Sequence, residues 1–492
     1  MRSSGVPRGK RVTITRREWL ASGVGLMAEA CTRAVSRATL PGSTRRPIVI
    51  VGAGLAGLAV ATELVENGRD VVVLEAQRRP GGRILTLRAP FADSLFVEAG
   101  ATHVVGDPDL LDLMHTAGVT VSKPRPSRGL ATIEYFEGKR TRFDPGVEPP
   151  ERRAFSPDEQ KLDFLGRLIR YFGAVKGVDP TLAWPPPALA HHDAQTGAEL
   201  LRERGASPGY IDDFATGFVG ERISDVSGAF VLREMAGFFR DFDLPSGRVD
   251  GGSDRLPLGL ARKLGGRVVY GAEVKRIDRT DDGARVAYLS EGTLHQLAAD
   301  RIVCAIPYTV LRHLEVVPAF SDRKQRAIRE LPMVSVARVF AQFDRRFWLL
   351  RGDSGSAETD LRTGPVRDET KLEPGTAGVL GAYASAERAR WIMSLPEPER
   401  LRAFVEDVEK VHPGAKGHFA VGASKCWDED PFARGAYAYF KPGQVMDLGP
   451  AIASAEGRVH FAGDHTSYRP GFMHGAVSSA RRVVREILSA DK

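Results

Sequence analysis

The sequence predicts an α/β fold: a discontinuous Rossmann-like dinucleotide-binding domain with a mixed-sheet substrate domain and an inserted helical domain. Two observations predict the Rossmann-like part, a glycine-rich segment at residues 48–83 and a second glycine-containing segment at residues 458–476. Because almost the whole chain separates them, the domain that they share must be interrupted. The length of 492 residues also exceeds what one hydrophobic core usually serves, so two or three domains are expected.

The first segment has the strand, turn, helix and strand of a dinucleotide-binding unit. Apolar runs at 48–51 and 71–74 predict two buried strands, and the alanine- and leucine-rich stretch between them predicts a helix. Glycines in the turn allow a tight bend, let a pyrophosphate approach the helix N-terminus, and let the helix pack closely on the strand. We expect the cofactor at four residues of this GAGLAG turn: Gly52, Gly54, Ala56 and Gly57.

Glu75 ends the second predicted strand, where a carboxylate can accept hydrogen bonds from a ribose diol. An acid at this position favours FAD or NAD over NADP. The motif by itself does not choose between FAD and NAD.

The residues that follow do choose. Pro80–Arg83, Val97–Thr102 and Phe461–Asp464 resemble motifs of the flavin amine oxidase family, which includes monoamine oxidases, polyamine oxidases and L-amino acid oxidases. The resemblance runs from about residue 48 to 488 and implies FAD. The cofactor should be noncovalent, because Ala436 stands where monoamine oxidases carry the cysteine that bonds to FAD. The resemblance further implies FAD contacts at Gly82, Arg83, Gly100, Ala101, Thr102, Val274, Trp427, Gly463, Asp464, Gly471, Phe472 and Met473.

The resemblance also implies the reaction. Several segments are more similar to bacterial L-amino acid oxidase-like proteins than to monoamine oxidases, so we expect an L-amino acid to be deaminated to a 2-oxo acid, ammonia and hydrogen peroxide. A biogenic amine or polyamine oxidase is the nearest alternative. A flavin-loaded binding or chaperone protein without oxidase activity is the alternative of another class.

Arg338 is the candidate catalytic residue, because many family members have at this position a lysine that holds a water near the flavin. An arginine stays protonated and cannot serve as a base, but it could hold the water or polarise oxygen chemistry. A strand arginine that merely pairs with a carboxylate is the alternative.

Five residues are predicted to contact the substrate. Tyr437, Tyr439 and Phe472 would form aromatic walls that exclude water, although the two tyrosines could equally belong to one face of an ordinary strand. His103 stands where many L-amino acid oxidases have an arginine for the substrate carboxylate. Arg367, in a loop that borders the substrate in related oxidases, is the alternative carboxylate partner.

The middle of the chain alternates between helical and strand-like signals. Capping boxes that begin at Ser156 and Thr196 predict helices of an inserted helical domain. The predicted division is 46–110, 247–320 and 426–488 for the FAD-binding domain, 111–150 and 321–425 for the substrate domain, and 151–246 for the helical domain.

Residues 1–45 are predicted to be an export signal and linker. Thr15–Leu20 resembles a twin-arginine signal, and a mildly apolar stretch with an Ala-x-Ala cleavage pattern follows it. The expected location is therefore the periplasm or the medium, with a plain basic tail on a cytoplasmic protein as the alternative.

Charge and cysteine content exclude other classes. Six basic and two acidic residues among the first 30 account for +4 of the formal net charge of +7, so the remainder carries +3, too little to indicate nucleic acid. No stretch is long and apolar enough to span a membrane, and no CxxC or His/Cys cluster indicates a metal. The expected partners are an amine or amino acid substrate and oxygen, and a homodimer is left open.

Overall fold

The computed structural model describes residues 46–123, 129–144, 147, 155–218, 220–371 and 373–490. The predicted export signal and linker lie outside the described residues. Among the described residues, no helix is long and apolar enough to cross a membrane, and no group of three or more His, Cys, Asp or Glu side chains could hold a metal ion.

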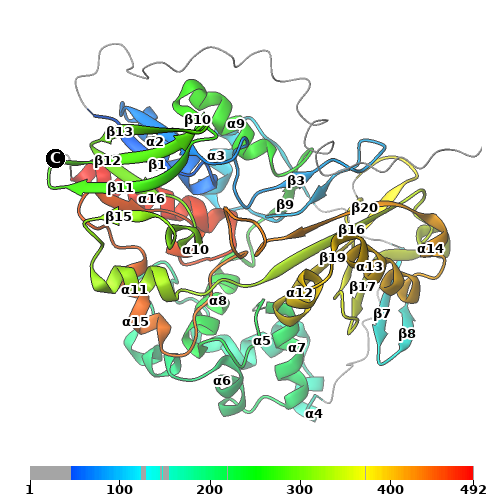
Figure 1. Cartoon of the computed structure of the whole chain (residues 1–492). Helices are drawn as coiled ribbons and strands as arrows, with labels where there is room; N and C mark the ends of the chain where they lie inside the picture. The colour runs from blue at the N-terminus through cyan, green and yellow to red at the C-terminus, as the bar shows by residue number, and fades with distance from the viewer. Residues whose placement is uncertain are drawn as a thin grey trace, which may run out of the picture. The chain divides into compact units, whose positions relative to one another are not determined.

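A five-stranded parallel sheet forms the core of the Rossmann-like part (Figure 1). The first strand pairs with its two neighbours in parallel register, and the last strand of the sheet comes from near the C-terminus. Side chains alternate along the first strand, so that Ile48 and Ile50 pack with helices while Val49 and Val51 face a second sheet. The strand order is β10 (Val268–Tyr270), β2 (Val71–Glu75), β1 (Ile48–Val51), β14 (Arg301–Cys304) and β21 (Val459–Phe461).

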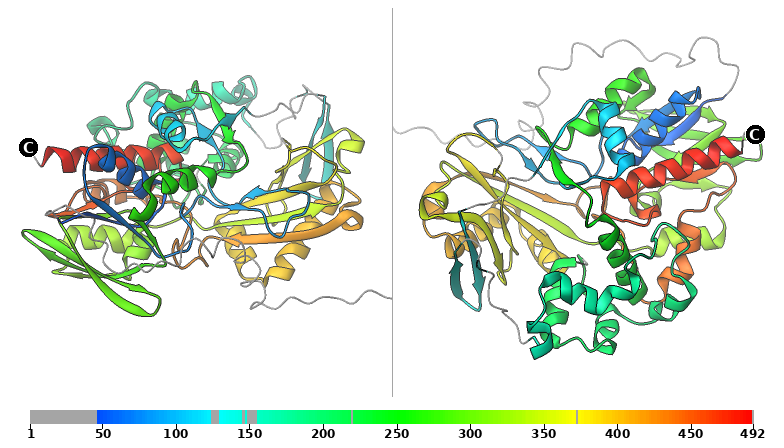
Figure 2. Two further views of the ribbon diagram at one scale, coloured as in Figure 1. Left: turned by 90° about the horizontal axis from the view of Figure 1, so that it is seen from above. Right: turned by 180° about the vertical axis from the view of Figure 1, so that it is seen from behind.

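Two layers cover this sheet. One is a four-stranded sheet, and the other is a group of helices in which the C-terminal helix lies beside the first helix, as Figure 2 shows from behind. The four strands are β13 (Thr293–Ala299), β12 (Gly283–Ser290), β11 (Glu273–Thr280) and β15 (Glu315–Val317). The helices are α2 (Leu55–Glu66), α3 (Pro108–Ala117), α9 (Arg255–Leu264) and α16 (Met473–Ser489).

Helix α3 differs from the predicted domain division. It packs on α9 and α16, so residues 111–117 lie with the Rossmann-like part and not with the substrate domain. The predicted boundary at residue 110 falls inside this helix, whose packing partners α9 and α16 are distant in the sequence.

A seven-stranded mixed sheet forms the second major part. Along β16, Ala337, Val339 and Ala341 pack under helices, so Arg338 points to the opposite face. The strand order is β20 (Phe419–Cys426), β16 (Val336–Phe343), β19 (Gly378–Ser385), β18 (Val366–Asp368), β17 (Asp353–Thr359), β7 (Ala131–Phe136) and β8 (Lys139–Phe143). The covering helices are α12 (Ala386–Met393), α13 (Glu397–Val411) and α14 (Ala415–His418).

Helices dominate residues 155–241 (Figure 1). Both predicted capping boxes are confirmed, since Ser156 and Thr196 each exchange hydrogen bonds with the glutamate three residues later. The helices are α4 (Pro157–Gln160), α5 (Phe164–Phe172), α6 (Gly197–Glu203), α7 (Pro208–Phe218) and α8 (Gly228–Asp241). The remaining α-helices are α10 (Tyr308–Leu311), α11 (Asp322–Glu330) and α15 (Gln444–Ile452), and the remaining strands are β3 (Thr86–Leu87), β4 (Val97–Glu98), β5 (Val104–Val105), β6 (Val121–Ser122) and β9 (Ser246–Val249).

Candidate active site

The turn after β1 can be built only from glycine at two positions. Gly52 has a φ of +101°, and a Cβ there would lie 2.9 Å from Ile306 Cγ2. A Cβ on Gly57 would lie 2.1 Å from the carbonyl oxygen of Gly52. Helix α2 therefore sits directly against the end of the strand, as the sequence predicts.

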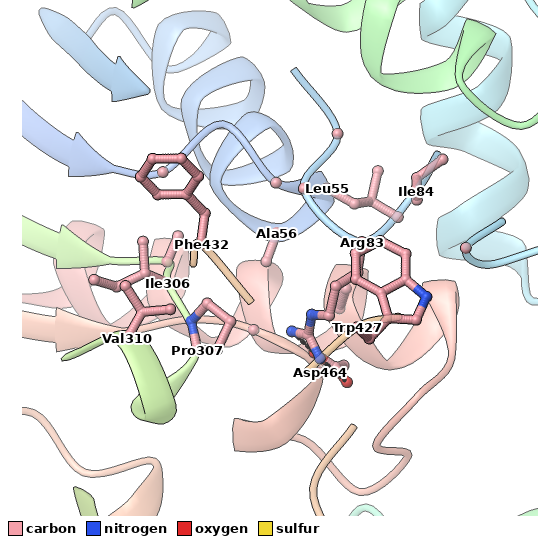
Figure 3. Close-up of a pocket in the computed structure, with 18 of the residues that line it drawn as sticks. Leu55, Ala56, Arg83, Ile84, Ile306, Pro307, Val310, Trp427, Phe432 and Asp464 are labelled. Carbon is pink, nitrogen blue, oxygen red and sulfur yellow. Dashed lines mark hydrogen bonds and ion pairs between the residues drawn. The ribbon is translucent and has the colours of Figure 1, made fainter. Parts of the chain in front are cut away.

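The N-terminus of α2 is open to a ligand. Gly54 is the N-cap residue, and neither a side-chain cap nor an acidic residue in the first turn satisfies the free N–H groups. Gly54, Leu55 and Ala56 line a cavity, with Leu55 and Ala56 at the start of the helix in Figure 3. Unpaired N–H donors and the positive end of the helix dipole favour a phosphate here.

Glu75 lies at the edge of the same cavity and is 5% exposed. Its two carboxylate oxygens accept hydrogen bonds from the N–H groups of Ala53 and Gln77, at 2.7 and 2.8 Å. Burial raises the pKa of this carboxyl, while the two N–H donors act in the opposite direction. Glu75 thus holds the turn, and each oxygen keeps a second lone pair for a ribose diol.

Arg83 and Asp464 join the two predicted segments although 381 residues separate them (Figure 3). Their side chains pair at 2.5 Å, Arg83 also donates to the carbonyl oxygen of Ala436 at 2.7 Å, and the N–H of Gly471 donates to Asp464 at 2.8 Å. Burial alone would raise the pKa of Asp464, but Arg83, His465 and these hydrogen bonds bring it below the usual range. The carboxylate is therefore ionised and fixed.

Close packing and a hydrogen bond fix Gly100 and Trp427 in the cavity wall. A Cβ on Gly100 would lie 2.0 Å from the carbonyl oxygen of Arg83, so only glycine fits there. The indole N–H of Trp427 donates to the carbonyl oxygen of Ala99 at 2.9 Å, which orients the ring in the cavity wall.

These parts surround one cavity of about 640 Å³. Gly57 supports the wall from behind and does not line it. The other predicted cofactor residues do line it: Gly52, Gly54, Ala56, Glu75, Gly82, Arg83, Gly100, Ala101, Thr102, Val274, Trp427, Gly463, Asp464, Gly471, Phe472 and Met473.

The cavity also has an apolar end that sequence reasoning missed. Ile306, Pro307, Val310 and Phe432 lie together there in Figure 3, and Arg434 lines the wall nearby. The first three follow strand β14, so their place at the carboxyl end of a parallel strand was the available signal. Nothing in the sequence around Phe432 and Arg434 marks them as cavity residues.

Arg338 both lines the cavity and forms a buried ion pair. Its Nη2 lies 2.6 Å from Glu369 Oε1, its Nε donates to the carbonyl oxygen of Ala382 at 3.1 Å, and the two paired side chains are only 7% and 3% exposed. Arg338 thus faces the cavity, as the catalytic assignment requires, and also pairs with a carboxylate, as the alternative predicts. The ion pair balances the charge of Arg338 without removing it from the cavity wall.

Tyr383 is a cavity residue that the sequence analysis did not identify. It pairs with Arg338 across β16 and β19, the guanidinium lies 5.3 Å from its ring centroid, and its hydroxyl lies 3.3 Å from that of Tyr437. Desolvation in the cavity wall raises the pKa of both tyrosines, so both are neutral phenols at neutral pH. The register of two strands brings these groups together, and no motif encodes it.

Phe472 lines the cavity, and a charged network holds it from behind. The guanidinium of Arg469 lies 4.1 Å from the centroid of the Phe472 ring and pairs with Glu234 at 2.9 Å and Asp241 at 3.2 Å. This contact restricts the ring on the side away from the cavity.

Of the three remaining predicted substrate residues, one lines the cavity and two do not. His103 lines the cavity, and desolvation and then nearby Arg248 lower its pKa, so its imidazole is mostly neutral at pH 7 before a ligand binds. Arg367 does not line the cavity, because it pairs with Glu358 at 2.6 Å. Tyr439 does not line it either, because it packs into the main hydrophobic core.

The donor set fits a flavin dinucleotide. The open helix N-terminus suits the pyrophosphate, Glu75 suits a ribose, Asp464 with Gly471 suits a polyol chain, and the aromatic walls at Trp427 and Phe472 suit a flat ring. Ala436, which lines the wall, offers no atom for a covalent bond to the cofactor.

Comparisons with known proteins agree with this site. The family model described as flavin containing amine oxidoreductase matches residues 55–488. The protein named "Putative L-amino-acid oxidase YobN" of Bacillus subtilis (strain 168) is 29% identical over 89% of this chain and 94% of its own, and a flavin-containing amine oxidase of Danio rerio is 27% identical over 90% and 86%. Among solved structures, a triple mutant of putrescine oxidase has a TM-score of 0.78 at 23% identity over 91% and 99% of the two chains. The cyclohexylamine oxidase of Brevibacterium oxydans IH-35A has a TM-score of 0.72 at 22% identity over 90% and 99%.

Proposed function

Because this chain belongs to the flavin-containing amine oxidoreductase family, we propose that it is an L-amino acid oxidase that releases a 2-oxo acid, ammonia and hydrogen peroxide. Family membership makes it an FAD-dependent amine oxidase, which confirms the predicted cofactor and fold class. The choice of an amino acid over a simple amine is the proposed part.

The observation that carries this choice is the set of donors at the substrate end of the cavity. Arg338 and the hydroxyls of Tyr383 and Tyr437 lie there together. Arg338 Nη2 and Nε are already paired, and within the described part of the chain Nη1 has no protein acceptor, so it can donate to a ligand. A guanidinium beside phenols is suited to a carboxylate, which a simple amine lacks.

The chain's own residues prepare the substrate for oxidation. Bound FAD supplies the two-electron oxidation of the carbon that bears the amine. Aromatic side chains at Trp427, Tyr437 and Phe472 exclude water and orient the substrate, and the donors around Arg338 hold its carboxylate. The bacterial relative named as an L-amino-acid oxidase supports this assignment, whereas the fish amine oxidase supports the alternative of a simple amine substrate.

A peroxide assay on matched pairs tests the proposal. The full-length holoenzyme is assayed with the twenty L-amino acids and with the amines that decarboxylation of each would give, such as phenylalanine against 2-phenylethylamine. We expect kcat/KM to be at least about tenfold higher for the best amino acid than for its amine, the effect of one charge-assisted hydrogen bond. A preference for the amines would overturn the amino acid assignment and leave an amine oxidase. Failure of every amine and amino acid to bleach the flavin without oxygen would instead favour the binding or chaperone alternative.

We also propose that the protein is exported through the twin-arginine route. The support is the Thr15–Leu20 sequence alone. Replacing Arg16 and Arg17 by lysine in the full-length protein, expressed in a bacterium that has this route, should keep the enzyme in the cytoplasm. Equal export of this variant and the natural protein would contradict the proposal.

A further inference from the structure

We infer that Gly220, in the helical part of the chain, positions the Tyr437 ring in the substrate cavity and so sets the width of the cavity at that wall. The inference rests on the proposed function, because it takes the Tyr437 wall as a contact of the substrate. Gly220 does not line the cavity, so it acts through Tyr437 as a positioning residue.

The contact between Gly220 and Tyr437 leaves no room for a side chain. Gly220 has a φ of +68°, and a Cβ there would lie 2.1 Å from the Tyr437 hydroxyl oxygen and 3.0 Å from its Cζ. On another side of the ring, a Cβ on Gly471 would lie 3.0 Å from Tyr437 Cγ. Two glycines from distant parts of the chain therefore define where the tyrosine can lie.

Ion pairs hold the backbone of Gly220 in place. The next residue, Glu221, is 6% exposed and pairs with Arg390 of α12 at 3.1 and 3.3 Å. Arg222 also pairs with Glu387 of the same helix at 3.1 Å, but this pair is solvent-exposed and contributes little, so the buried Glu221 carboxylate provides the main attachment. The helical part is thus fastened to the seven-stranded-sheet part at the point where Gly220 meets the tyrosine, so the tyrosine must yield if Gly220 gains a side chain.

Displacing the ring changes the cavity directly. The Tyr437 hydroxyl lies 3.3 Å from that of Tyr383, and both line the same wall. Relieving a 2.1 Å contact requires a movement of about 1 Å, and a misplacement of that size can lower a rate about a hundredfold. Gly220 would therefore affect turnover although it touches neither the substrate nor FAD.

The first experiment tests the contact by thermal unfolding of full-length holoenzymes. They are the natural protein, G220A, Y437F and G220A/Y437F, all with the same excess of FAD. Gly205→Ala is the matched control, because Gly205 also has a positive φ, +79°, and a Cβ there meets nothing within 4 Å. We expect G220A to lower Tm more than G205A does, and we expect Y437F to relieve most of that excess because it removes the oxygen at 2.1 Å. Equal Tm losses in G220A and G205A would overturn the inference, as would a G220A effect that Y437F leaves unchanged.

The second experiment tests the consequence for the reaction. We expect G220A to lower kcat/KM for the best substrate about 10- to 100-fold, G205A to change it less than twofold, and G220A/Y437F to resemble Y437F within about threefold. A G220A enzyme with unchanged kcat and KM would overturn the positioning role. If the natural enzyme oxidised no amine or amino acid, the proposed function would fail, whereas the Tm comparison would still report on the contact.

Discussion

Arg338 lines the cavity and pairs with Glu369, which does not line it, and this ion pair decides how the role of Arg338 can be tested. Removing only the arginine would leave a buried carboxylate without a counter-charge, which is strongly destabilising by itself. Replacing both residues by glutamine removes the guanidinium from the cavity without creating that uncompensated charge. The double variant is therefore the informative one.

The R338Q/E369Q enzyme should lose its preference for a carboxylate. We expect KM for the best amino acid to rise about tenfold or more, since a hydrogen bond to a charged group contributes about 1.5–3 kcal/mol, and KM for the matched amine to change less than about threefold. Steady-state kinetics on the pair measures this. Arg367→Gln is the control, because Arg367 pairs with Glu358 outside the cavity. A parallel rise of both KM values would argue against Arg338 as the carboxylate partner.

At the scale of elements, the packing of helix α2 against strand β1 depends on the close approach of Gly57 to the Gly52 carbonyl. In Gly57→Ala the new methyl group would meet backbone at 2.1 Å, so α2 must move away from the strand and its N-terminus with it. We expect the purified variant to hold less than about a tenth of the natural FAD content, measured by flavin absorbance per chain. Gly449→Ala is the control, because it lies in helix α15 with nothing within 4 Å of the added carbon. Full FAD content in G57A would contradict this explanation of the turn.

Strand β4 carries a buried acid that makes stability depend on pH. Glu98 accepts hydrogen bonds from Thr86 and from the N–H of Ser253 just before α9, and burial raises its pKa from 4.5 to about 7. Because the folded-state pKa is the higher one, the stabilisation is present below pH 4.5 and is lost as pH rises through about 7. The loss over this window is about 3 kcal/mol.

Glu98→Gln should make the free energy of unfolding less dependent on pH between pH 4.5 and 7. Glutamine does not titrate, so the free energy of unfolding of the variant should fall less between pH 4.5 and 7 than that of the natural protein. Unfolding in urea at a series of pH values measures the difference. The same slope in both proteins would show that Glu98 does not titrate in this way.

The elements also show how far sequence reasoning reaches. The glycine turn, its flanking strands and the two capping boxes were predicted because local chemistry determines them. Tyr383 was missed because it reaches the cavity only through the register of β19 against β16, and Phe432 because a long loop brings it there. Tyr439 was assigned to the cavity together with Tyr437 because the segment resembles the family's cavity lining, but only Tyr437 lines the cavity, whereas Tyr439 packs into the hydrophobic core.

At the scale of the whole molecule, Asp464 connects distant parts of the chain to one another. It pairs with Arg83 and accepts a hydrogen bond from the N–H of Gly471, so its charge organises the cavity where the segments 48–83 and 458–476 meet. Bound FAD should therefore stabilise the entire fold, by about 2.7 kcal/mol at a hundredfold excess over its Kd.

Asp464→Asn should weaken FAD binding and so reduce the stabilisation that FAD gives to the fold. If the variant binds FAD about tenfold more weakly, the same FAD concentration stabilises it by only about 1.4 kcal/mol. Unfolding of the apoprotein with and without FAD measures the two increments. Asp447→Asn is the control, since Asp447 pairs with Arg326 at the surface. An unchanged increment in D464N would show that the Arg83 pair does not serve FAD binding.

The late arrival of β21 and α16 has a consequence for synthesis of the protein. Strand β21 is an outer strand of the parallel sheet, and α16 packs against α2, yet both come after every strand of the seven-stranded sheet in chain order. A nascent chain can therefore complete the seven-stranded sheet, whose last strand ends at Cys426, while the dinucleotide-binding core still lacks an edge and a helix. Cofactor loading must then wait until β21 and α16 have been synthesised, so their translation sets the earliest moment at which an active oxidase can exist.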